Sequence, residues 1–99
     1  MEKFKLIEGV FSAKDAKEVL LTLIDQKIKF HELKSFSSEI KFGKADEESL
    51  SRVDDLTKTK NDIIKYLVGK VDKEFDFNIK SFIEIEEEEV KIEKVLTLN

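Results

Sequence analysis

The hydrophobic pattern near the start of the chain changes from a period of two to a period of 3.6. Residues 3–11 alternate loosely between apolar and polar positions, which predicts a strand with a bend or bulge at Gly9. Apolar residues then recur at spacings of three and four, which predicts a helix over residues 13–35. Ser12 and Asp15 form a capping box, with Asp in place of the usual Glu, and this fixes where the helix begins.

A second helix is expected over residues 45–68. Acidic residues at positions 46–48 suit the positive end of its dipole, and Gly69 is a natural stop. One apolar stripe runs along this helix at alternating spacings of three and four residues. Two such helices in succession indicate a helical hairpin.

The segment between the helices, Phe36–Gly43, is rich in serine near its start and breaks the apolar pattern. We expect it to be an ordered connection that folds back over the helix ends through Phe36, Ile40 or Phe42. The same three apolar residues make it a candidate interaction site, because connections with their own hydrophobes are often functional. The alternative is that they only cap the open end of the hairpin.

The last third of the chain returns to a period of two. Apolar residues on alternate positions predict a half-buried strand over residues 75–86. The side chains expected to face the helices are those of Phe75, Phe77, Ile79, Ile83 and Ile85. A second alternating run over residues 90–98 predicts an antiparallel hairpin that turns within Glu86–Glu89. A helix over residues 87–96 is the competing interpretation.

These elements predict one domain over residues 1–99, of the α+β class. A helical hairpin packs on one face of a small antiparallel sheet in the order β-α-α-β-β, with the first strand completing the sheet. A sheet that is covered on one side only leaves Phe82 and Val95 exposed on the opposite face. Exposed apolar positions on a small sheet often mark a partner surface.

Charge is unevenly distributed along the 99 residues. Lysine and arginine balance aspartate and glutamate over residues 1–80, and residues 81–99 carry the whole net charge of −4. An acidic end repels phosphate, which argues against nucleic-acid binding there. The absence of cysteine excludes disulfides and thiolate chemistry. Without a signal peptide or a long apolar run, the chain is expected to be cytoplasmic, with no membrane partner.

His31 is the single histidine and the obvious residue for proton transfer or metal binding. It lacks a second histidine, and a site would need Glu32, Glu39 or Asp55 brought to it by the fold. We favour a structural His31 and expect no cofactor and no metal. In an antiparallel hairpin Lys27 lies roughly opposite residues 54–55, so it could pair with Asp54 or Asp55 in a polar layer that fixes the register. His31, Lys27 and Asp55 are the candidate polar site.

Two further charged groups have weaker functional interpretations. Lys58, Lys60 and Lys65 could serve a nucleic-acid-associated regulator, and Lys27 with the first two could bind an anion. The run Glu86–Glu89 could bind a cation or a basic partner. Four consecutive glutamates on a strand point alternately to opposite faces, so a solvated tip or charged edge is favoured.

The stretch Phe11–Asp46 resembles small bacterial proteins of no assigned activity, through Lys27–His31, Phe36–Ser38 and Phe42–Gly43. The resemblance covers about a third of the chain. It implies a bacterial or bacteriophage protein and assigns no site.

Three functional classes remain open. The leading hypothesis is a non-enzymatic interaction or assembly module that acts as a homo-oligomer, most simply a homodimer. The alternatives are a small ligand-binding protein or enzyme centred on His31, and a nucleic-acid-associated regulator. The dimer is predicted to form through the outer face of the sheet, where Phe82 and Val95 lie, and Phe82→Asp is predicted to shift it toward monomer. If the chain is a monomer, another protein is the remaining partner for Phe82.

Overall fold

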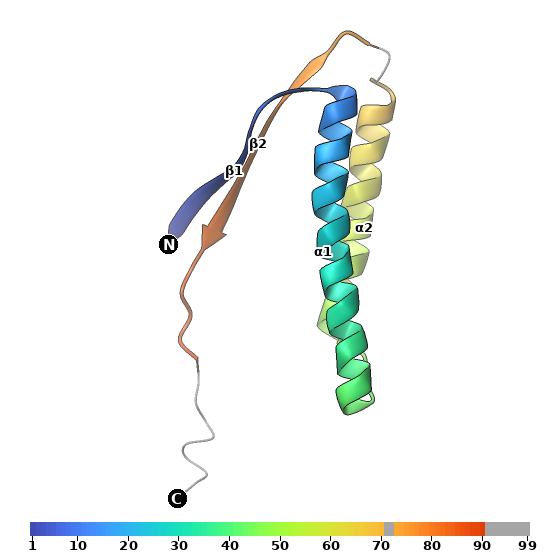
Figure 1. Cartoon of the computed structure of the whole chain (residues 1–99), viewed down its shortest axis with the longest axis vertical. Helices are drawn as coiled ribbons and strands as arrows, with labels where there is room; N and C mark the ends of the chain where they lie inside the picture. Colours follow the sequence, from blue (N-terminus) through green and yellow to red (C-terminus); the bar gives the residue numbers. More distant parts are fainter. Residues whose placement is uncertain (71–72, 91–99) are drawn as a thin grey trace, which may run out of the picture.

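The computed structural model describes residues 1–70 and 73–90. Its elements are β1 (Glu2–Ser12), α1 (Ala13–Phe42), α2 (Glu47–Val68) and β2 (Asp76–Ile85). The predicted α+β class, the helical hairpin and the antiparallel sheet are all present (Figure 1). The sheet has two strands, and residues 86–90 form no regular element. The third strand expected over residues 90–98 falls almost wholly outside the described residues.

The two strands form a ribbon in which β1 and β2 pair antiparallel over nearly their whole length. Phe11 pairs with Phe77, and Gly9 pairs with Ile79. The irregularity in β1 lies between Lys5 and Ile7, so the bulge expected at Gly9 is displaced toward the N-terminus. A Cβ at Gly9 would lie 3.5 Å from the ring of Phe11, an ordinary van der Waals contact, so the strand does not require glycine there.

Helix α1 begins where the capping box predicted. Ser12 is its N-cap, and the Ser12 hydroxyl accepts a hydrogen bond from the Asp15 amide at 3.1 Å. Strand β1 ends at Ser12 and α1 begins at Ala13, so no residue separates strand from helix. The direction of the ribbon is therefore tied directly to that of the helix.

The loop expected at Phe36–Gly43 is wrong, because α1 continues to Phe42. No proline or glycine interrupts this stretch, and serine costs a helix only a few tenths of a kcal/mol relative to alanine. The helix ends at Gly43, which has a φ of 72° and donates its backbone N–H to the Glu39 carbonyl at 2.9 Å. Since this left-handed conformation favours glycine, Gly43 decides where the hairpin turns.

The two helices pack antiparallel through a row of half-buried side chains. The ion pair between Asp25 and Lys60, at 2.6 Å, links the middle of α1 to the middle of α2. Near the hairpin loop Ser35 and Ser49 are both buried, and the Ser49 hydroxyl donates to the Asp46 carboxylate at 2.5 Å. The expected position of the second helix is confirmed, with its start at Glu47.

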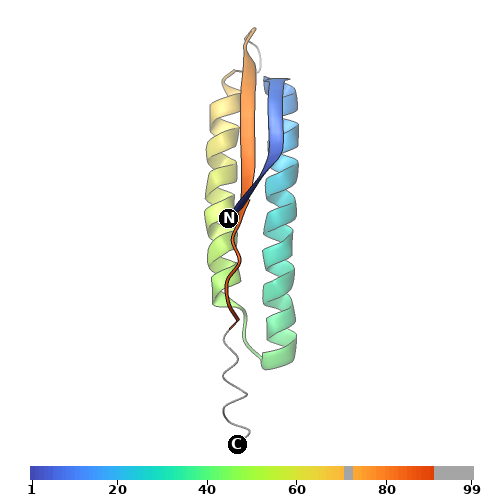
Figure 2. The same ribbon diagram turned by 90° about the vertical axis from the view of Figure 1, so that its left-hand side faces the viewer.

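The ribbon and the helical hairpin meet at one end and diverge toward the other (Figure 1). Viewed at right angles, the ribbon lies over one face of the helix pair (Figure 2). We call the meeting end, where β1 enters α1 and α2 leads toward β2, the joint. The buried apolar residues of the described chain are Ile7, Ala13, Ala16 and Leu67. Three of them belong to the joint, which is therefore where the core sits.

Leu67 offers a direct test of this core. Its side chain is 3% exposed, whereas that of the adjacent Val68 is 54% exposed. We expect Leu67→Ala to lower the free energy of unfolding by about 2–4 kcal/mol, because it removes buried methyl groups and leaves a cavity. Val68→Ala, the matched control, should change it by less than about 1 kcal/mol. Urea unfolding at a fixed protein concentration measures both, and equal effects would show that the joint is not the core.

Candidate interaction surface

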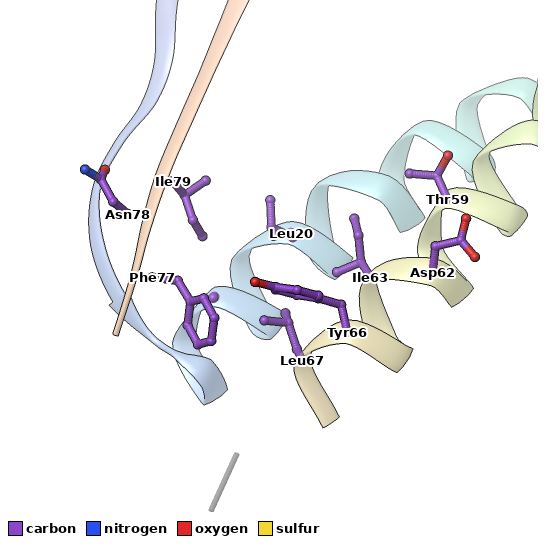
Figure 3. Close-up of a pocket in the computed structure, with 10 residues that line it drawn as sticks. Leu20, Thr59, Asp62, Ile63, Tyr66, Leu67, Phe77, Asn78 and Ile79 are labelled. Atoms are coloured by element: carbon purple, nitrogen blue, oxygen red, sulfur yellow. The ribbon is translucent and has the colours of Figure 1, made fainter. Parts of the chain in front are cut away.

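An apolar groove of about 410 Å³ lies at the joint between the helices and β2. Figure 3 shows Phe77 and Ile79 of β2 directed toward the helices, while Asn78 points away. The rings of Tyr66 and Phe77 meet edge to face, with centroids 6.0 Å apart. The Lys70 ammonium lies 4.3 Å from the centre of the Tyr66 ring. The Tyr66–Phe77 contact, worth about 0.5–1.5 kcal/mol beyond burial, thus holds this end of the ribbon on α2, while the Lys70 contact is local to the end of that helix.

Beyond the groove, the ribbon carries apolar side chains that nothing covers. In the register of the strands, Phe4 pairs with Ile83, on the face that continues the row from Phe77 and Ile79. Phe4 is 52% exposed, Ile83 42% and Ile85 54%. We call Phe4, Ile83 and Ile85 the open inner face of the ribbon. The prediction that β2 turns this row toward the helices is confirmed at Phe77 and Ile79, and further along the row the two layers have separated (Figure 1).

Helix α1 carries a second uncovered apolar row. Leu23, Phe30, Leu33 and Ile40 recur at spacings of seven and three residues, so they share one side of the helix. Their exposure rises along the helix, from 37% at Leu23 to 60% at Phe30 and 69% at Ile40. We call these four residues the far face of α1. A helix that is apolar on two sides is normally enclosed by neighbours on both.

The three residues of the predicted connection lie on this same part of α1. Phe36, Ile40 and Phe42 are 58%, 69% and 75% exposed, so they do not fold back over the helix ends. They extend the apolar surface of the helix instead. The three residues thus remain a candidate surface, but they belong to a helix and not to a connection.

The outer face of the ribbon has a different character. Phe82 is 45% exposed, pairs with Lys5 and lies under the Lys3 ammonium, which is 4.6 Å from the ring centre. Its other neighbours on that face are charged, and Lys5 forms an ion pair with Glu8. Val95, its predicted companion, lies outside the described residues. The apolar surface of the ribbon is therefore concentrated on the inner face.

The polar candidates His31, Lys27 and Asp55 do not interact with one another. Asp55 interacts with Arg52 at 3.5 Å, and the ion pair between the helices is Asp25 with Lys60. Within residues 1–70 and 73–90, Lys27 belongs to no ion pair. The sequence predicts an ion pair between the helices, of Lys27 with Asp54 or Asp55. The structure has one between Asp25, two residues before Lys27, and Lys60, five residues after Asp55.

His31 lies half-buried in α1, with its ring edge to face against that of Phe30 at 5.2 Å. Neither ring nitrogen is accessible, and neither has a hydrogen-bond partner among the described protein atoms. No cluster of three or more metal-ligating side chains occurs in the described part of the chain. The surroundings of His31 are thus those of an interior packing position.

The remaining charged candidates are spread out. Lys60 is held by Asp25, while Lys58 and Lys65 are exposed on α2. Glu86–Glu89 come directly after β2 and are exposed at the free end of the ribbon. Within the described ranges, no helix has the length and apolarity that crossing a lipid bilayer requires.

Comparison with protein-family models, curated proteins and solved structures finds no match to this chain. The function of the chain is consequently inferred from its own surfaces. The groove between Tyr66 and Phe77 was not anticipated as a site, although the alternating aromatics of the last third placed Phe77 on the helix-facing row.

The environment of His31 yields a stability prediction. Replacing the imidazole by an apolar side chain of similar size removes two buried nitrogens that lack protein partners. We expect His31→Leu to leave stability unchanged or raise it by about 1 kcal/mol, and His31→Gln to lower it by about 0.5–2 kcal/mol. Urea unfolding distinguishes the two. Strong destabilisation by leucine, with glutamine tolerated, would instead show that the imidazole makes a polar interaction that the fold needs.

Proposed function

We propose that this chain is a non-enzymatic assembly module whose interior is completed by a second copy of itself. The single observation that supports this proposal is the imbalance between buried and exposed apolar side chains. Of the described residues, four apolar ones are buried and eighteen large apolar ones are exposed. Monomeric proteins rarely leave contiguous apolar surfaces of this kind open to water.

The location of the exposed residues supports an interface, because they gather on two faces and are not scattered singly over the surface. The open inner face of the ribbon and three residues of the far face, Phe30, Leu33 and Ile40, are all at least 42% exposed, whereas Leu23 still lines a pocket with Leu6 and Ile7 of β1. Within the described residues, a lone copy has only two layers, so it has no further element to place on these faces. A second copy supplies a ribbon and a hairpin with the same apolar rows, as a symmetric dimer requires.

A direct test measures mass in solution by size-exclusion chromatography with light scattering. The wild-type chain should be a dimer or a larger oligomer at micromolar concentration. Ile83→Asp should dissociate it, because burying an isoleucine contributes about 1.5–3 kcal/mol and a dimer contains two. The dissociation constant should rise about 100-fold or more.

Val10→Asp is the matched control. Val10 lies on the outer face of the ribbon, pairs with Asn78 and is 67% exposed, so a charge there should leave the oligomer intact. Phe82→Asp tests the outer face directly. Dissociation by Phe82→Asp with none by Ile83→Asp would move the interface to the outer face, and a wild-type monomer at high micromolar concentration would refute the assembly proposal altogether.

A further inference from the structure

The distal half of α1 and the free end of the ribbon carry charges of opposite sign, although the start of α2 adds Asp46, Glu47 and Glu48 beside α1, with Asp46 4.0 Å from Lys34. Residues 27–44, the distal half of α1 and its cap, hold five lysines against two glutamates, a net charge of +3. Residues 84–89, the end of β2 and the segment directly after it, hold five glutamates and no basic residue. We call Glu84–Glu89 the acidic end of the ribbon. At the joint, by contrast, both arms are apolar.

The lysines are not placed at random on α1. Leu20, Lys27, Lys34 and Lys41 recur at intervals of seven residues and therefore form one row along the helix. Leu20 lines the groove against β2, so this row is on the ribbon side of the helix. The row is apolar where the ribbon contacts it, and Lys27, Lys34 and Lys41 are exposed where the ribbon has diverged. We call these three lysines the basic row.

The ribbon shows the matching gradient. Its inner face runs from Phe77 and Ile79 in the groove to the exposed Ile83 and Ile85, and the acidic end comes directly after them. The spans also agree. Lys34 and Lys41 lie about 32–42 Å along α1 from the joint at about 1.5 Å per residue. Glu87, two residues beyond the end of β2, lies about 36 Å from Asp76 if the chain stays extended at about 3.3 Å per residue.

A ribbon laid along a hairpin would thus bring apolar residues against apolar residues and glutamates against lysines. In its own chain the ribbon does not lie this way (Figure 1). β1 enters α1 without an intervening residue, and the Ser12 cap fixes the angle at that point. The surface that α1 offers is consequently open to the ribbon of another molecule.

We propose that the acidic end and open inner face of one copy's ribbon dock on the basic row and far face of α1 in a second copy. The exchange is reciprocal, so each dimer contains two such contacts. This inference rests on the proposed function and assigns its interface. Because the charged groups are exposed, the contact should weaken as salt is added, when screening shortens the range of the attraction.

Reciprocal charge reversal tests the exchange. Lys27→Glu with Lys41→Glu changes the net charge of residues 27–44 from +3 to −1, and replacing all four of Glu86–Glu89 by lysine changes that of residues 84–89 from −5 to +3. In either variant alone, both partners of every contact carry the same sign. Each should self-associate about tenfold or more weakly than wild type at low salt. An equimolar mixture restores opposite signs in both contacts, and native mass spectrometry should show 1:1 heterodimers.

Lys58→Glu with Lys65→Glu is the control. It lowers the charge of α2 by the same amount as the Lys27 and Lys41 changes lower that of α1. Lys65, like Lys41, is the basic residue in the last turn of its helix. This variant should dimerise like wild type. Circular dichroism of each variant establishes that the helices are retained.

The outcomes separate the two proposals. A wild-type monomer refutes the proposed function. A wild-type dimer whose charge variants associate normally leaves that function standing and overturns the exchange. If mixing restores nothing, but a chain that carries both sets of reversals regains wild-type behaviour, the acidic end meets the basic row of its own chain and the exchange between copies is wrong.

Discussion

The direct passage of strand β1 into helix α1 at Ser12 and Ala13 is the constraint on which the rest of the structure depends. The Ser12 hydroxyl accepts the amide of Asp15, which satisfies a free donor of the first helical turn and sets the direction of the entering chain. On the other side of the joint, Phe77 of β2 packs against Tyr66 of α2. The ribbon and the hairpin are therefore attached at one end, and no linker residue separates β1 from α1 there.

This geometry explains why so little of the apolar surface is buried. Near the joint the two layers are close enough to enclose Ala16 and Leu67 completely or almost so. Further away the same apolar rows continue on both arms, at Ile83 on the ribbon and Phe30 on α1, and remain open to water. Apolar surface that stays exposed to water contributes no hydrophobic stabilisation until another surface covers it. The fold is thus closely packed at the joint and open at the far ends of both arms.

Much of this architecture could be predicted from the sequence because local signals carry it. The Ser12 capping box fixed the start of α1, and the period of two in the last third fixed β2 and the row containing Phe77. The end of α1 could not be predicted well, because serines resemble a loop in composition, and a helix with good neighbours tolerates them. Gly43 ends α1, but the sequence alone did not show that the helix continues as far as this glycine.

The candidate site was harder to predict than the fold. Sequence patterns locate apolar residues on a face, and they do not say whether another layer of the same chain covers that face. Ile83 was correctly placed on the helix-facing row, yet its exposure results from the angle at the joint. The pairing of Lys60 with Asp25, rather than Lys27 with Asp55, likewise depends on a hairpin register that is set by Gly43.

The central claim, that a second copy completes the interior, is tested most directly by the dependence of thermal unfolding on protein concentration. A chain whose apolar faces are covered only in the oligomer gains stability by mass action, so its midpoint temperature should rise steadily as concentration increases from about 1 to 100 μM. A midpoint that stays constant over that range, with a single cooperative transition, would mean that one chain folds alone and would contradict the account.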